Sequence, residues 1–278
     1  MSERRRRAVL ADGTGADAAP VHLADTVGRV ARAAWPWSGS GHGQLAVVLV
    51  ALTVVTGLVD AVSYLALGHV FVANMTGNVV FLGFALAGAP GLSAPASLAA
   101  LGAFLLGAVA GGRIAVRYGG QRGRHLRTAM TFAGALVLLA TLLAATFGQP
   151  VAEHARYALI APLAIAMGIQ NATARGLAVP DLTTTVLTLT LTGIAADSRL
   201  AGGTGGHPAR RLVAVTAMFT GALLGALLVT DVDLVLPLAI AAALIAASAL
   251  AATRLDGRAA RANPGSASGS AMPSASPE

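Results

Sequence analysis

The stretch LAVVLVALTVVTGLVDAVSYLA, residues 45–66, is almost wholly apolar but contains one acidic residue, Asp60. At ~1.5 Å per residue, a helix of this length crosses a bilayer core of about 30 Å. A carboxylate inside such a helix costs about 2.5–3.5 kcal/mol on insertion scales unless it is neutralised, paired or hydrated. The stretch therefore predicts a membrane-spanning helix with a polar site buried between helices, although Asp60 lies past the middle of the span and could also reach the headgroups.

Apolar runs recur along most of the 278 residues, which are 55% hydrophobic and only 11% charged. A soluble domain would be roughly 25% charged. Six runs are long enough to span a membrane, at residues 45–66, 94–116, 128–147, 157–174, 212–230 and 234–253. Two more are short or interrupted by polar residues, at 70–88 and 182–196. The fold class predicted is all-α, a polytopic transmembrane helix bundle of about six spans plus two short discontinuous helices, because lipid cannot satisfy open backbone groups.

Basic residues define the predicted orientation. All 19 are Arg, and 17 of them gather in residues 1–44, 113–127, 199–211 and 254–278, at the ends of apolar runs. The positive-inside rule places these segments, and hence both termini, in the cytoplasm. Residues 1–44 are expected to be an Arg-rich tail, with an interfacial helix over 21–35 or disorder as alternatives, and residues 254–278 a disordered tail. The composition suggests a bacterial inner membrane, no nucleic-acid partner and, without cysteine, no disulfide or thiolate metal site.

An internal repeat is indicated by three matches in the same order. GLVDA at 57–61 matches GIQNA at 168–172, VANMTGNVV at 72–80 matches VPDLTTTVL at 179–187, and Gly107 and Gly111 match Gly221 and Gly225. The repeats would cover residues 45–147 and 157–253, and three spans in each would give them opposite orientations, as in many secondary transporters. Chance similarity between Ala/Leu/Gly-rich helices is the alternative. The four glycines predict close helix packing, within the chain or in a homodimer.

Polar residues in the two repeats form the candidate binding site. Asp60 is matched by Asn171, and Asn74 by Asp181, so each half supplies one carboxylate and one amide. If the short segments meet near mid-depth, further oxygen ligands would come from Ser63, Thr76, Asn78, Gln170, Thr183, Thr184 and Thr185. Such a cluster could bind a small polar solute, a proton or Na⁺. Helix capping by Asn74, Asn78 and Asp181, and backbone bonding by the threonines, remain alternatives.

The two signature stretches, GLVDAVSYLALGHVFVANMTGNVVFLG (57–83) and GIQNATARGLAVPDLTTTVLTLTLTGIAADS (168–198), resemble the YoaK-like family of bacterial integral membrane proteins, a domain of unknown function. The resemblance covers about residues 45–253. It implies a membrane fold and marks these residues as characteristic, without naming a substrate. Gly176 stands where the resemblance leads us to expect a second basic residue after Arg175.

The sequence thus favours a secondary transporter or permease that works by alternating access, with Asp60 and Asp181 as proton or ion sites. A non-transporting sensor or assembly partner is the alternative. No nucleophile–base pairing, metal-ligand spacing or phosphate-binding loop is present, so we expect neither an enzyme nor a cofactor. His69 is a weaker candidate for proton relay. The solute, the coupling ion and the oligomeric state are not given by the sequence.

Overall fold

The computed structural model describes residues 43–118, 120–147, 150–179, 187–203 and 208–262. Side chains are described as far as residue 254. The expected N-terminal tail and its surface helix therefore lie outside the described residues, and so does the C-terminal tail from residue 263 onwards.

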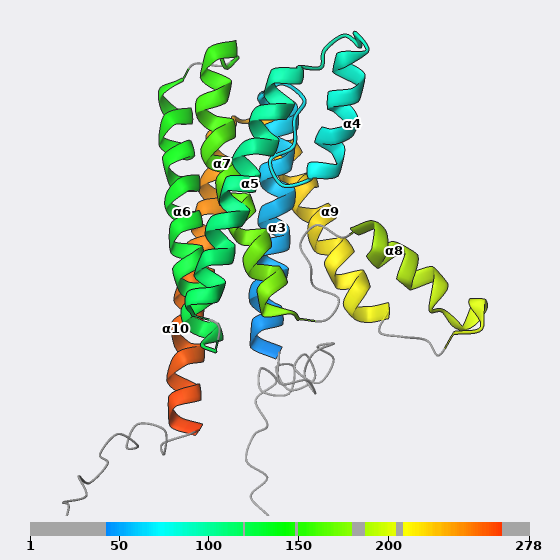
Figure 1. Ribbon diagram of the computed structural model, residues 1–278. Coiled ribbons are helices and arrows are strands. Elements are labelled where there is room, and N and C mark those ends of the chain that lie inside the picture. The colour runs from blue at the N-terminus through cyan, green and yellow to red at the C-terminus, as the bar shows by residue number, and fades with distance from the viewer. Residues whose placement is uncertain (1–42, 119, 148–149, 180–186, 204–207, 263–278) are drawn as a thin grey trace, which may run out of the picture. The chain divides into compact units, whose positions relative to one another are not determined.

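The described chain is helical, as predicted, and contains eight α-helices (Figure 1). These are α3 (Gly43–Ala66), α4 (Met75–Leu86), α5 (Ala94–Arg117), α6 (Arg122–Thr146), α7 (Glu153–Leu177), α8 (Leu187–Ala196), α9 (Pro208–Asp231) and α10 (Val235–Ala262). A single 3₁₀ turn, η1 (Arg199–Ala201), follows α8. Six helices are long and apolar enough to cross a membrane, and α4 and α8 are short and apolar. The prediction of six spans and two short helices is confirmed.

Local sequence explains where several helices begin and end. Ser93 caps α5, because its hydroxyl accepts a hydrogen bond from the backbone N–H of Ala96 at 3.3 Å, and a proline follows in the first turn. Ala178 ends α7 in the left-handed conformation, with φ of 49°. Helix α10 continues to Ala262, past the predicted end of the span at residue 253, because the segment LDGRAARA is rich in good helix formers.

The long helices pack across the two halves of the sequence. Helix α3 packs on α9, and α5 packs on α7; in Figure 1, α5 and α7 run side by side. Helix α6 contacts α7, and α10 contacts α3. The described helices thus form two groups, which we call the first group (α4, α5, α6 and α7) and the second group (α8, α9, α10 and α3). The groups meet mainly where α6 packs on α10, and also where α3 contacts α7.

The short helices pack on the long helix that follows each of them. Helix α4 lies on α5, and α8 lies on α9. The sequence predicted instead that the two short segments meet each other near mid-depth. In the structure, residues 67–74 turn back towards Asp60, so that α4 begins beside the last turns of α3 and runs back towards the end of the bundle (Figure 1). Residues 180–186, at the start of the second short segment, lie outside the described residues.

Glycines allow the closest helix approaches. A Cβ on Gly57 would collide with the backbone of Met218, Gly221 and Ala222 in α9, and a Cβ on Gly221 with the backbone of Val54. In the same way, a Cβ on Gly168 would collide with Phe104, Gly107 and Ala108 in α5, and a Cβ on Gly107 with Ile165. Gly111 and Gly225 make matching contacts one turn further along, against Ile169 and Leu58. All four glycines of the two Gly-x-x-x-Gly pairs therefore lie in contacts within the chain.

Candidate functional site at the α3–α4 junction

Asp60 is a buried acid of the bundle, and its side chain holds the chain segment that follows α3. It lies in α3 and is 3% exposed. Its Oδ1 accepts hydrogen bonds from the backbone N–H of Val72 at 3.1 Å and of Ala73 at 2.8 Å. Its Oδ2 is buried and has no hydrogen-bond partner in the described part of the chain. One carboxylate oxygen is therefore used to fix the backbone of the segment that follows α3.

Asn78 holds the same segment from the other side. It lies in α4, fully buried, and its Oδ1 accepts a hydrogen bond from the backbone N–H of Phe71 at 2.9 Å. Its Nδ2 donates to the carbonyl oxygen of Phe71 at 2.5 Å. The amide satisfies both backbone groups of one residue, a match that a carboxylate cannot make. Asp60 and Asn78 together fix residues 71–73 between α3 and α4.

The junction segment, residues 67–74, turns sharply after α3. Gly68 and His69 both have positive φ, of 95° and 57°. The ring of Phe71 stacks on Tyr64, with centroids 5.2 Å apart, and the Nδ1 of His69 lies 3.1 Å from the carbonyl oxygen of Gly91. A Cβ on Gly77 would lie 2.7 Å from the ring of Phe71, so glycine is needed there for the ring to pack. His69 thus has a structural contact at the edge of the junction.

Gln170 forms a second buried polar contact, between the two groups of helices. It lies in α7, fully buried, and its Nε2 donates to Thr56 Oγ1 at 2.9 Å and to the carbonyl oxygen of Leu52 at 3.1 Å. Its Oε1 has no partner among the described residues. Sequence reasoning chose Gln170 but missed Thr56, whose only signal was its place next to Gly57 in a span.

The other predicted residues are placed differently. Ser63 donates to the carbonyl oxygen of Asp60 at 3.1 Å, within its own helix. Asn74 occupies the N-cap position of α4 but makes no side-chain capping bond, and Thr76 is exposed. Asn171 is half-buried and donates to the carbonyl oxygen of Met167 at 2.9 Å. Four predicted residues lie outside the described residues: Asp181, Thr183, Thr184 and Thr185.

A third buried polar group lies where α6 meets the end of α7. His125 is 4% exposed, and its Nε2 has no partner in the described ranges. A Cβ on Gly176 would lie 3.1 Å from its ring. The absence of a large side chain at position 176 is therefore what leaves room for the His125 ring.

Residues 48–251 match a family described as "Protein of unknown function (DUF1275)". The chain belongs to this family. It is also similar to the UPF0700 transmembrane protein YoaK of Bacillus subtilis (strain 168), with 37% identity over 147 residues. That match spans 52% of this chain and 64% of the relative. No solved structure matches the chain.

Membership in the DUF1275 family agrees with the six long apolar helices, and the chain is a multi-pass membrane protein. Asp60, Asn78 and Gln170 all lie within the matched residues. The resemblance to the YoaK-like family noted from the two signature stretches is confirmed. The family description names no activity, so function has to be argued from the site.

Proposed function

We propose that this family member is a secondary permease for a small polar or ionic solute, and that Asp60 is its proton or cation site. The observation that carries the proposal is the arrangement around Asp60: a buried carboxylate fixes the junction between two groups of helices with one oxygen, and its other oxygen has no partner among the described residues. Intramembrane carboxylates of this kind are costly and mark ion or proton pathways in transporters.

Reciprocal helix contacts support an internal repeat of opposite orientation. Every residue in the α3–α9 glycine contacts has a counterpart in the α7–α5 contacts at a constant spacing. The contact residues of α3 and α7 are 111 residues apart: Gly57, Val54, Leu58 and Ala61 match Gly168, Ile165, Ile169 and Ala172. The contact residues of α5 and α9 are 114 residues apart: Gly107, Gly111, Phe104 and Ala108 match Gly221, Gly225, Met218 and Ala222. The α3–α9 contact and the α7–α5 contact are therefore equivalent: each joins a helix of one sequence half to the matching helix of the other half.

Burial along α6 and α10 follows the same rule. Seven of the ten buried residues of α6 have buried counterparts 108 residues later, six of them in α10 and one, Leu234, just before it. They are residues 126, 129, 130, 133, 137, 140 and 144, matched by 234, 237, 238, 241, 245, 248 and 252. Helices related in this way, with an odd number of spans per half, are typical of transporters with inverted repeats.

The moving parts would be the two packed groups, because each sequence half contributes helices to both of them. The chain passes between the groups after α3, at residues 67–74, and again between α7 and α8. Asp60 in the second group binds the first of these connections, and Asn78 in the first group binds it as well. A proton or cation at Asp60 Oδ2 would withdraw charge from the bonds to Val72 and Ala73 and so alter how the junction is held.

Residues 178–186 would be the matching junction in the second half, with Asn171 in the place of Asp60. There Asp181, Thr183, Thr184 and Thr185 would supply the remaining polar groups, and Gln170 Oε1 would face the solute path. We further propose that the protein resides in the bacterial inner membrane with both termini in the cytoplasm, as the distribution of Arg favours.

Transport currents from proteoliposomes adsorbed on a sensor test this function. Amino acids, organic acids, amines and sugars would be supplied in turn at constant ionic strength. We expect at least one class to evoke a current that Asp60→Asn abolishes. Val79→Ala, at an exposed position of α4, serves as the control and should retain the current. An unchanged current in Asp60→Asn, or no current with any class, would count against the proposal.

A further inference from the structure

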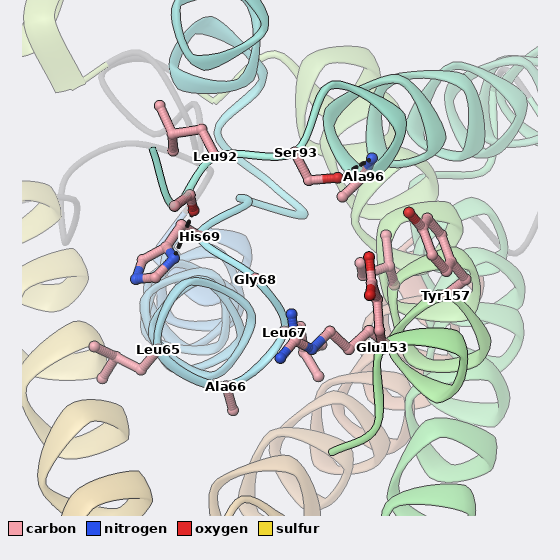
Figure 2. Close-up of a pocket in the computed structure, with 13 residues that line it drawn as sticks. Leu65, Ala66, Leu67, Gly68, His69, Leu92, Ser93, Ala96, Glu153 and Tyr157 are labelled. Atoms are coloured by element: carbon pink, nitrogen blue, oxygen red, sulfur yellow. Dashed lines mark hydrogen bonds between the residues drawn. The ribbon is translucent and has the colours of Figure 1, made fainter. Parts of the chain in front are cut away.

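A cavity of about 420 Å³ lies at the end of the bundle where α3 ends and α7 begins. Its walls are the turn at residues 65–69, the turn at 91–93 and the first turns of α7 (Figure 2). The volume suits a small solute. Asp60 does not line it, although Leu67, Gly68 and His69 of the junction segment do.

Two oppositely charged residues, Arg156 and Glu153, line this cavity and do not form an ion pair with each other. Arg156 is half-buried, and its Nε donates to the carbonyl oxygen of Val151 at 3.3 Å. Its terminal guanidinium nitrogens and the carboxylate of Glu153 form no ion pair with each other or with another described residue, although both residues line the cavity and lie three residues apart on α7.

The guanidinium of Arg156 is positioned by the fold. A Cβ built on Gly68 would lie 3.3 Å from Nη1 and 3.8 Å from Cδ of Arg156, so the side chain lies across the glycine. Gly68 has a φ of 95°, a conformation that other residues rarely adopt. The junction turn therefore provides both the space and the wall against which the Arg156 side chain rests.

Glu153 and Tyr157 complete the polar side of the cavity. Figure 2 shows the carboxylate of Glu153 and the hydroxyl of Tyr157 on the side nearest Ser93 and Ala96, with His69 on the opposite side. An acidic residue in the first turn of a helix is stabilised by the helix dipole alone. The helix dipole does not explain Arg156, whose guanidinium lies one turn later, lines the same cavity and forms no ion pair with a described residue.

We infer that this cavity binds a small zwitterion, a molecule with an oxyanion and an ammonium group joined by a short linker. Arg156 would take the oxyanion, because guanidinium forms paired hydrogen bonds with carboxylate or phosphate oxygens. Glu153 would take the ammonium group, and Tyr157 would add a hydrogen bond. The same chemistry occurs in free amino acids and in the phosphoethanolamine headgroup of lipids. Binding here does not depend on transport.

Isothermal titration of the full-length protein in nanodiscs tests the inference. β-Alanine, propionate and propylammonium share a three-carbon chain and differ only in their charged groups. We expect β-alanine to bind more tightly than either single-charge analogue. Phosphoethanolamine tests the headgroup source, and nanodiscs that contain phosphatidylethanolamine should weaken β-alanine binding if lipid is the natural occupant.

Three variants separate binding from folding. Arg156→Gln and Glu153→Gln should each weaken β-alanine binding by about tenfold or more, as expected when a charge-assisted hydrogen bond is lost. His154→Gln alters an exposed neighbour that does not line the cavity and should bind as the native chain does. Arg156→Lys keeps the charge and controls for misfolding. Absence of binding by both zwitterions, equal binding of propionate, or binding unaffected by both Gln substitutions would overturn the inference. None of these results depends on currents from the Asp60 variants.

Discussion

At the scale of single residues, the α3–α4 junction depends on two side chains that accept the backbone hydrogen bonds a helix would otherwise satisfy. The segment 71–73 belongs to no helix, yet its three backbone N–H groups are satisfied by Asp60 and Asn78. Buried donors left without acceptors are costly, typically about 1–3 kcal/mol each. The two residues thus have a structural role that can be separated from ligand binding by the choice of substitution.

Substitutions of Asp60 should separate these two roles. Asp60→Asn retains an oxygen that can accept from Val72 and Ala73, so we expect a small change in melting temperature in detergent. Asp60→Ala removes the acceptor from two buried N–H groups and should lower the unfolding free energy by roughly 2–5 kcal/mol. If both variants melt alike, the hydrogen bonds to the junction are not what stabilises it.

Asn78→Asp is expected to be destabilising despite its close similarity in size. The carboxylate can still accept from the N–H of Phe71, but it cannot donate to the carbonyl oxygen of the same residue, and it adds a buried negative charge. Thermal unfolding should show a larger loss for this variant than for Ser63→Ala, which removes a bond within one helix. A smaller loss for Asn78→Asp would contradict the pairing with Phe71.

The sequence predicted part of the site. Composition and spacing alone indicated Asp60, a carboxylate in an apolar span, and Asn78, an asparagine in an apolar run interrupted by polar residues. In the structure, both side chains bind the backbone of residues 71–73. The contact of Gln170 with Thr56 joins residues far apart in sequence and depends on how α3 and α7 cross. The sequence did not single out Arg156 and Glu153, which line the cavity, because they lie in the connection between two predicted spans, where charged residues are common.

At the scale of helices, the glycine contacts define how closely the spans approach. Without Cβ atoms at these points, backbone meets backbone between α3 and α9 and between α5 and α7. In lipid, where apolar surface alone does not drive helices together, such close packing is a main source of association. Glycine at these positions therefore stabilises the bundle, whereas elsewhere in a helix it is unfavourable.

Gly57→Ala and Gly168→Ala should each destabilise the bundle by about 1–3 kcal/mol, because the added methyl group meets backbone that cannot move aside. Gly102→Ala is the matched control. It lies in α5 with nothing within 4 Å of an added Cβ, and should be neutral or slightly stabilising. Melting temperatures in one detergent compare all three. Equal behaviour of Gly57→Ala and Gly102→Ala would show that α3 and α9 do not approach as described.

Helix positions were predicted well and their ends less well. Hydropathy located the apolar core of each span, but α6 begins at Arg122 and α10 reaches Ala262, both beyond the apolar runs. Polar residues with high helix propensity extend a helix into the interface, and hydropathy does not register them. The short helices were identified because their runs contain polar residues, although their packing on α5 and α9 was not expected.

At the scale of the whole bundle, the sequence halves do not correspond to the packed groups. Similarity between residues 45–147 and 157–253 indicated a repeat, but nothing in a single sequence specifies that α3 packs on α9 and α5 on α7. Because of this exchange, a motion between the two groups would bend the described chain at residues 67–74, where it passes from α3 to α4. The second crossing, between α7 and α8, lies mostly outside the described residues. Asp60 lies at the first of these crossings, so under the proposed function a proton or cation on Asp60 would affect this motion.

Distances between spin labels at the two ends of the bundle test this account most directly. Exposed positions allow one pair at residues 86 and 232, at the end near α4, and another at 116 and 200, at the end near α8. The chain has no native cysteine to interfere. We expect each pair to populate two distances, and Asp60→Asn to lengthen one pair while shortening the other. A single unchanged distance in both pairs, with and without the substitution, would contradict alternating access around the Asp60 junction.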